Sequence, residues 1–300
     1  MKILVTGASG LVGSELVPRL KAIGHQVFKL SRNAADNPDE ISWDPYIGFA
    51  PDESEKLEGM DAVVHLAGES IADGNWSEEK KKKIRDSRVL GTRTLVGALN
   101  DLKKRPRIFV GASAIGFYGS RGDETLTEES EAGEGFLPDV CIEWEAEADK
   151  AAEFGARVVH VRTGIVLSKD GGALQKMLTP FNFGLGGVIG SGKQYMSWIS
   201  IDDLVNILIF VLNNDDMKGA VNATSPNPAT NEEFTKTLGA VLSRPTILPV
   251  PEFGIKLLFG EMGERLVIEG ARVIPEKLGE AGYKFSYEEL EPALRHALEN

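Results

Sequence analysis

Strand-length segments alternate with amphipathic segments along the first two thirds of the chain. Residues 2–6 form an apolar run that fits a buried strand, and residues 14–20 carry apolar side chains at helical spacing. Further strands are predicted at residues 26–30, 40–44, 60–69, 107–113 and 158–162. Helical patterns over 76–99 and 137–153 separate the later strands. Such alternation is typical of parallel strands joined by helices, so we expect an α/β fold.

The first strand runs directly into a glycine turn with the spacing G-x-x-G-x-x-G. Gly7 lets the chain turn sharply off the strand, Gly10 leaves room for a pyrophosphate to approach the backbone, and Gly13 lets the helix pack closely on the sheet. The N–H groups and the positive dipole at the start of the helix attract phosphate. We therefore expect a Rossmann-type, doubly wound parallel sheet of about seven strands. Its first turn predicts cofactor contacts from Gly7, Ser9, Gly10, Leu11, Val12 and Gly13.

The second strand ends at Ser31 and Arg32, where the adenosine ribose lies in folds of this type. An acidic residue at this position would accept hydrogen bonds from both ribose hydroxyls and repel a 2′-phosphate. A serine followed by an arginine instead favours a ribose that carries a 2′-phosphate. The sequence therefore predicts NADP(H) as the cofactor.

Charge and composition narrow the class of partner. The 300 residues exceed one average domain, and the hydrophobic content of 42% is that of a globular protein. The formal net charge of −12 argues against a nucleic acid or an anionic membrane as the main partner, since both would repel this protein. We expect an acidic enzyme that acts on a small-molecule substrate, as a monomer or a homodimer.

Cysteine and histidine usage points to a reducing compartment and to no metal. The single cysteine, Cys141, excludes an internal disulfide, and the four scattered histidines have no zinc-ligand spacing. No apolar run reaches the ~18 residues needed to span a bilayer, and the first strand begins too early to leave room for a cleavable signal. We therefore expect a cytoplasmic protein.

The glycine spacing, with Thr6 before the first glycine, resembles the short-chain dehydrogenase/reductase superfamily, particularly its extended, epimerase-like branch. The resemblance extends to the segment His65-Leu66-Ala67-Gly68 and to Arg162-Thr163-Gly164-Ile165-Val166, which match the superfamily's H-L-A-A and R-P-G-x-V segments. It implies cofactor contacts near the adenine, the pyrophosphate and the nicotinamide. The candidates are Trp43, Asp44, Leu66, Ala67, Gly68, Glu69, Arg88, Ala112, Arg162, Gly164 and Ile165. For Trp43, a place in the hydrophobic core is an equal alternative.

The catalytic residues of the superfamily are only partly present. The resemblance implies that Ser113 hydrogen-bonds a substrate oxygen, and Tyr118 is the candidate proton donor. The usual Y-x-x-x-K pair is missing, because its expected positions hold Cys141 and Glu145. A carboxylate raises the pKa of a neighbouring acid, where the lysine would lower it. The usual mechanism therefore needs a substitute, for which Ser113, Tyr118, Cys141 and Glu69 are the candidates.

The resemblance runs nearly end to end and is closest to the atypical "epimerase family" proteins, which carry a C-terminal domain of unknown function. It implies an NADP-binding domain over 1–168 and 198–224, and a smaller C-terminal α/β domain over 169–197 and 225–300. Within these, we expect Asp203 to cap a helix over 204–212 and a further helix over 272–278. Met196 replaces the arginine with which sugar-nucleotide epimerases bind phosphate, which disfavours a UDP-sugar substrate.

Two functions remain open at this point. One is an NADP(H)-dependent oxidoreductase or epimerase that acts on a small non-nucleotide substrate. The other is a non-catalytic NADP(H)-binding protein that senses redox state, which Glu145 at the lysine position favours.

Overall fold

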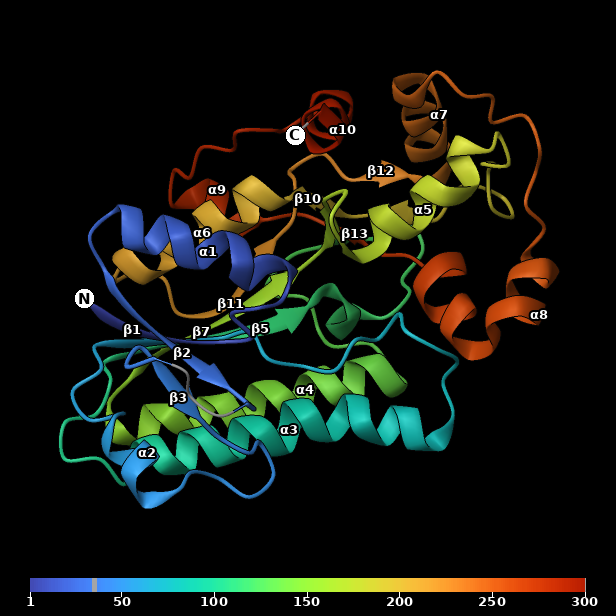
Figure 1. The fold of residues 1–300 in the computed structure, drawn as a ribbon. Coiled ribbons are helices and arrows are strands. Elements are labelled where there is room, and N and C mark those ends of the chain that lie inside the picture. The colour runs from blue at the N-terminus through green and yellow to red at the C-terminus, as the bar shows by residue number, and fades with distance from the viewer. Residues whose placement is uncertain (34–36, 300) are drawn as a thin grey trace.

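The computed structural model describes residues 1–33 and 37–299, and within them a seven-stranded sheet forms the centre of the molecule (Figure 1). The strand order is β11-β7-β5-β4-β1-β2-β3, and every neighbouring pair is parallel. The strands are β1 (Lys2–Thr6), β2 (Gln26–Ser31), β3 (Glu40–Ser42), β4 (Ala62–His65), β5 (Ile108–Ala114), β7 (Arg157–Thr163) and β11 (Gly219–Ala223). The expected doubly wound parallel sheet is therefore confirmed.

Helices cover both faces of this sheet (Figure 1). One face carries α1 (Leu11–Ala22), α6 (Ile201–Asn213) and the short α9 (Glu276–Glu280). The other carries α3 (Glu78–Asn100) and α4 (Phe136–Asp149), with α2 (Pro51–Glu55) beside them. Short helical turns at Ile115–Tyr118 and Lys150–Phe154 follow β5 and α4. The strand order reverses between β1 and β4, and ligands bind in open sheets of this kind outside the carboxyl ends of the strands at that point.

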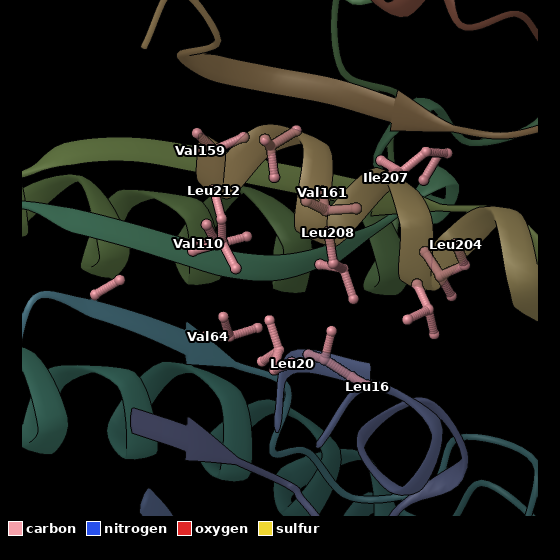
Figure 2. Close-up of a cluster of buried hydrophobic side chains, with 14 of the residues drawn as sticks. Leu16, Leu20, Val64, Val110, Val159, Val161, Leu204, Ile207, Leu208 and Leu212 are labelled. Carbon is pink, nitrogen blue, oxygen red and sulfur yellow. The ribbon is translucent and has the colours of Figure 1, made fainter. Parts of the chain in front are cut away.

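Two hydrophobic cores hold the helices to the sheet. Figure 2 shows the first, in which Leu16 and Leu20 of α1 and Leu208 of α6 face Val64 and Val110 of the sheet. All five side chains are at most 1% exposed. The second core lies on the opposite face and joins α3 to the sheet through residues such as Leu95, Leu99 and Phe109. Burial on both faces explains why the central strands are continuous apolar runs in the sequence.

The remaining chain builds a smaller layer of helices and three short strand pairs. The strand pairs are β8 (Ile165–Leu167) with β10 (Trp198–Ser200), β9 (Tyr195–Met196) with β12 (Ala229–Thr230), and β6 (Thr125–Leu126) with β13 (Arg272–Val273). The helices are α5 (Gly172–Asn182), α7 (Asn231–Leu242), α8 (Glu252–Gly263) and α10 (Leu290–Glu299), with a π-helical turn at Glu264–Ile268. In the described ranges, no helix is both long and apolar enough to cross a membrane.

Two local predictions are wrong, for identifiable reasons. The N-cap of α6 is Ser200, whose hydroxyl accepts from the amide of Asp203, so the helix begins three residues earlier than expected. Asp203 is fully buried and accepts instead from the amides of Ser286 and Tyr287. The helix expected over 272–278 is divided, because Pro275 stands between β13 and α9.

Gly13 makes the closest backbone contact of the first turn. A Cβ atom at this position would lie 2.2 Å from the carbonyl oxygen of Gly7. We expect Gly13→Ala to lower the free energy of unfolding by about 1–3 kcal/mol, the usual range for overpacking. Gly97→Ala in α3 is the matched control, since no described atom outside its own helix lies within 4 Å of that Cβ position. It should stabilise the protein by about 0.5–1 kcal/mol. Urea unfolding measures both, and equal effects would contradict the packing argument.

Candidate nucleotide-binding and active site

The turns after β1 and β4 meet backbone to backbone at the switch point of the sheet. Gly7 has a φ of +65°, and a Cβ atom there would lie 2.9 Å from the carbonyl carbon and oxygen of Leu66. The hydroxyl of Thr6 accepts from the amides of Leu66 and Ala67, each at 3.0 Å. Only glycine fits this position, because it tolerates the positive φ and adds no side chain.

The start of α1 suits an anion. Gly10 is the N-cap and provides no side-chain acceptor, and the first turn contains no acidic residue. The first amides of a helix have no partner within the helix, so a phosphate group can satisfy them. Ser9 and Gly10 are exposed, whereas Gly13 is buried against the turn. The glycine turn therefore has the shape and the donors that a pyrophosphate requires.

His65 packs beside the glycine turn and contacts Thr6, the residue before it. It is fully buried at the end of β4, with Nδ1 at 2.7 Å from the hydroxyl of Thr6 and Nε2 at 3.0 Å from the hydroxyl of Thr92. Burial lowers the pKa of His65 to about 4, so its ring is neutral near pH 7. It acts as a packed polar bridge between β1 and α3.

The loop after β4 is braced by α3. Glu69 donates its amide to Ser87, at 3.0 Å, and its carboxylate accepts from Lys80 at 2.7 Å. Arg88 donates to the carbonyl oxygen of Glu69 at 3.0 Å and lies over the ring of Trp144. Burial lowers the pKa of Arg88. The guanidinium would also be the nearest neighbour of a Cβ at Gly68, at 3.2 Å, so Arg88 holds this loop in place.

A hollow of about 350 Å³ lies beside the ends of β2 and β3, and Arg32, Ser42, Trp43 and Asp44 are among the residues that line it. Arg32 is exposed there, and Ser31 accepts from the amide of Asn33. Trp43 lines the hollow and is only 6% exposed, packed in the second core, so its place in the core is confirmed and its contact with the adenine stays a prediction. The carboxylate of Asp44 shapes the hollow by accepting from two amides of the next turn.

A buried ion pair includes Glu145, at the position expected to hold the missing lysine. Glu145 of α4 accepts from Nε and Nη2 of Arg162, both at 2.9 Å, and from the hydroxyl of Ser113 at 2.6 Å. The exposed fractions of the three residues are 8%, 5% and 4%. Sequence reasoning missed the pairing of Glu145 with Arg162. A signal was present, since an arginine in a buried strand needs a carboxylate partner.

Tyr118 belongs to the same buried network. Its hydroxyl donates to the side-chain oxygen of Asn222 at 2.7 Å and accepts from Nη1 of Arg162 at 3.0 Å. The Tyr118 side chain is fully buried, and burial raises its pKa. The guanidinium of Arg162 also lies 3.4 Å from the ring centre of Phe117. Tyr118 and Arg162 thus stabilise each other in this structure, and their roles toward substrate and cofactor stay predictions.

The turn after β7 reaches the smaller layer. Gly164 donates its amide to Ala223, and a Cβ atom on Gly164 would lie 2.4 Å from the carbonyl oxygen of Ser197. Ile165 donates to the same oxygen at 2.8 Å. Ala112, on β5, is paired in register with Val161 of β7. The nicotinamide-side candidates therefore lie at the carboxyl ends of β5 and β7, as the glycine turn lies at that of β1.

The comparison with known families agrees with this geometry. Residues 3–223 match the family described as the NAD dependent epimerase/dehydratase family, and residues 250–297 match a domain of unknown function, DUF1731. The resemblance to epimerase family proteins with a C-terminal domain of unknown function is thus confirmed.

Relatives of this chain occur in bacteria and mammals. Epimerase family protein Mb2239 of Mycobacterium bovis is 41% identical over 296 residues, which are 98% of this chain and 97% of that protein. The crystal structure of human epimerase family protein SDR39U1 with NADPH has a TM-score of 0.90 and 36% identity, and covers 100% of both chains. The nucleoside-diphosphate sugar epimerase from Corynebacterium glutamicum has a TM-score of 0.83 and 36% identity over 99% of this chain and 58% of that one.

The buried ion pair predicts strong energetic coupling. Arg162→Leu leaves the carboxylate of Glu145 buried without a cation, so we expect it to destabilise the protein by about 3–5 kcal/mol. The double variant with Glu145→Leu should lose much less than the sum of the two single losses. Urea unfolding of the four proteins measures the coupling. The exposed pair Arg295–Glu291 is the control, expected to couple by under about 0.5 kcal/mol. Additive losses at Arg162 and Glu145 would refute the pairing.

The environment of Cys141 predicts an unreactive thiol. Burial, with a smaller effect from Glu145, raises the pKa of Cys141 to about 11. Only the thiolate reacts, and at pH 8 roughly a thousandth of this thiol is ionised. We expect iodoacetamide to modify the native protein far more slowly than the urea-unfolded protein, as measured by mass spectrometry. Equal rates in the two states would show that Cys141 is accessible and ionised.

Proposed function

The chain belongs to the NAD dependent epimerase/dehydratase family, and on that premise we propose that it binds NADP(H) along the carboxyl edge of its parallel sheet. The observation that carries the proposal is the first turn: Cβ atoms on Gly7 and Gly13 would strike backbone atoms, and the exposed Gly10 leaves the first amides of α1 open to a phosphate. The NADPH in the crystal structure of human SDR39U1 supports the same choice of cofactor.

Arg32 decides the preference for the phosphorylated cofactor. It lines the hollow at the end of β2, and the two residues directly after that strand, Arg32 and Asn33, are not acidic. An arginine can donate two parallel hydrogen bonds to a phosphate, whereas it gains little from an unmodified ribose. Trp43 and Asp44 complete the wall of this hollow.

We propose further that the protein is an oxidoreductase or epimerase for a small non-nucleotide substrate. The nicotinamide, when bound, supplies the hydride chemistry. Ser113 donates its only proton to Glu145, so its remaining lone pairs can accept a hydrogen bond from a substrate hydroxyl or amine. The ion pair with Arg162 holds Glu145, and through it orients Ser113. The acidic charge and single cysteine support a cytoplasmic enzyme.

One observation favours a second function. Cys141 and Glu145 stand where the superfamily has its tyrosine and lysine, and both are buried. A protein that binds NADP(H) and reports redox state to a partner needs neither of the missing residues. Screening carbonyl metabolites for NADPH oxidation separates the two functions. Turnover that Ser113→Ala abolishes supports the enzyme, and binding without turnover of any carbonyl supports the sensor.

The choice of cofactor is tested by calorimetric titration of Arg32→Ala. We expect the variant to weaken NADPH by roughly 1–3 kcal/mol, the value of a charge-assisted pair, and to leave NADH nearly unchanged. Arg295→Ala, in α10, removes an exposed arginine elsewhere and should change neither affinity. Equal losses of affinity for NADPH and NADH would show that Arg32 does not bind the 2′-phosphate.

A further inference from the structure

Arg272 of β13 is a cation without an anionic partner in the described part of the chain. Its Nε atom is closed off from solvent and donates to no acceptor. The ion pairs of the surrounding segment join Lys256, Arg265 and Lys277 to glutamates, and Arg272 takes no part in them. The rest of the side chain is partly exposed, so its positive charge is open to an anion from solvent.

The backbone of Arg272 is locked beside the nicotinamide-side turn. Ser197 donates its hydroxyl to the carbonyl oxygen of Ala271, at 2.7 Å, and accepts from the amide of Val273 at 2.9 Å. These bonds hold both neighbours of Arg272. The carbonyl oxygen of Ser197 is the atom that a Cβ on Gly164 would strike. Ser197 thus links the backbone around Arg272 to the turn after β7.

The side chain of Arg272 has a defined direction. Ala271 and Val273 are buried with Tyr118 and Leu126 in one cluster, so strand alternation turns Arg272 to the other face. Its guanidinium lies over the ring of Tyr195, 5.2 Å from the ring centre. The aromatic face favours the cation without neutralising it. Arg272 is therefore prearranged, partly exposed and still able to pair with an anion.

We propose that Arg272 binds the anionic group of the substrate, a carboxylate or a phosphate on a small organic molecule. This rests on the proposed function and deepens it, because it names the class of substrate that the C-terminal segment selects. The planar guanidinium suits two parallel hydrogen bonds to either oxyanion. Arg272 lies on the smaller layer, where Ser197 links its backbone to the turn after β7, so the anion would anchor the end of the substrate that does not react.

The test observes Arg272 directly in the full-length protein saturated with NADPH. The protein is labelled with ¹⁵N-arginine, and the Nε–H resonance that Arg272→Lys removes is assigned to Arg272. Malonate and inorganic phosphate are then titrated separately. We expect a saturable shift of this resonance with one or both probes, and the probe that binds more tightly identifies a carboxylate or a phosphate site. Arg265, paired with Glu269, is the matched control and should not respond.

The variant Arg272→Met keeps most of the aliphatic stem on Tyr195 and removes the charge. It should weaken the responding probe by about ten- to a hundredfold, while NADPH affinity stays within about twofold. An Arg272 resonance that neither probe moves would overturn the proposal without using any variant. Repeating the titration without NADPH keeps the two proposals apart. If NADPH does not bind, the proposed function alone is refuted. The shift of the Arg272 resonance with malonate or phosphate still decides whether Arg272 binds an anion.

Discussion

The close approach of two backbone turns at the centre of the sheet is the constraint on which the rest of the site depends. The turn after β1 and the turn after β4 touch through Gly7 and Leu66, and the hydroxyl of Thr6 satisfies two amides of the second turn. His65 fills the space below with a neutral ring between two threonines. This packing directs the start of α1, where the first amides have no partner within the helix, at the point where the strand order reverses.

The second organising feature is the buried pair of Glu145 and Arg162. It joins α4 to β7, and the hydroxyl of Ser113 joins β5 to both. A buried ion pair adds little net stability but makes the loss of either partner expensive, so it enforces one arrangement of these three elements. The two charges of the pair balance each other inside the protein.

The C-terminal segment is attached to the sheet domain by buried acceptors. Asp203 in α6 accepts from the amides of Ser286 and Tyr287, and Glu128 accepts from the amides of Asn222 on β11 and Lys277 in α9. Burial raises the pKa of Glu128. Residues 120–134, between the helical turn at Ile115–Tyr118 and α4, therefore include a buried anchor for β11. Together with Ser197, these contacts hold the smaller layer over the carboxyl ends of β5 and β7.

The sequence by itself determined the features that depend on neighbouring residues. The parallel sheet and the glycine turn follow from short apolar runs and glycine spacing, and Arg32 is placed by the end of its own strand. Tertiary structure decided what depends on distant residues. Glu145 meets Arg162 because the chain passes through α4 and returns as β7, and β13 forms because residues 125–126 offer it a partner. Aspartate is a residue type that commonly caps helices, yet Asp203 accepts a hydrogen bond from the amide of Ser286, more than eighty residues away. Local periodicity encodes backbone conformation, whereas the partner of a buried charge is known only when the chain has folded around it.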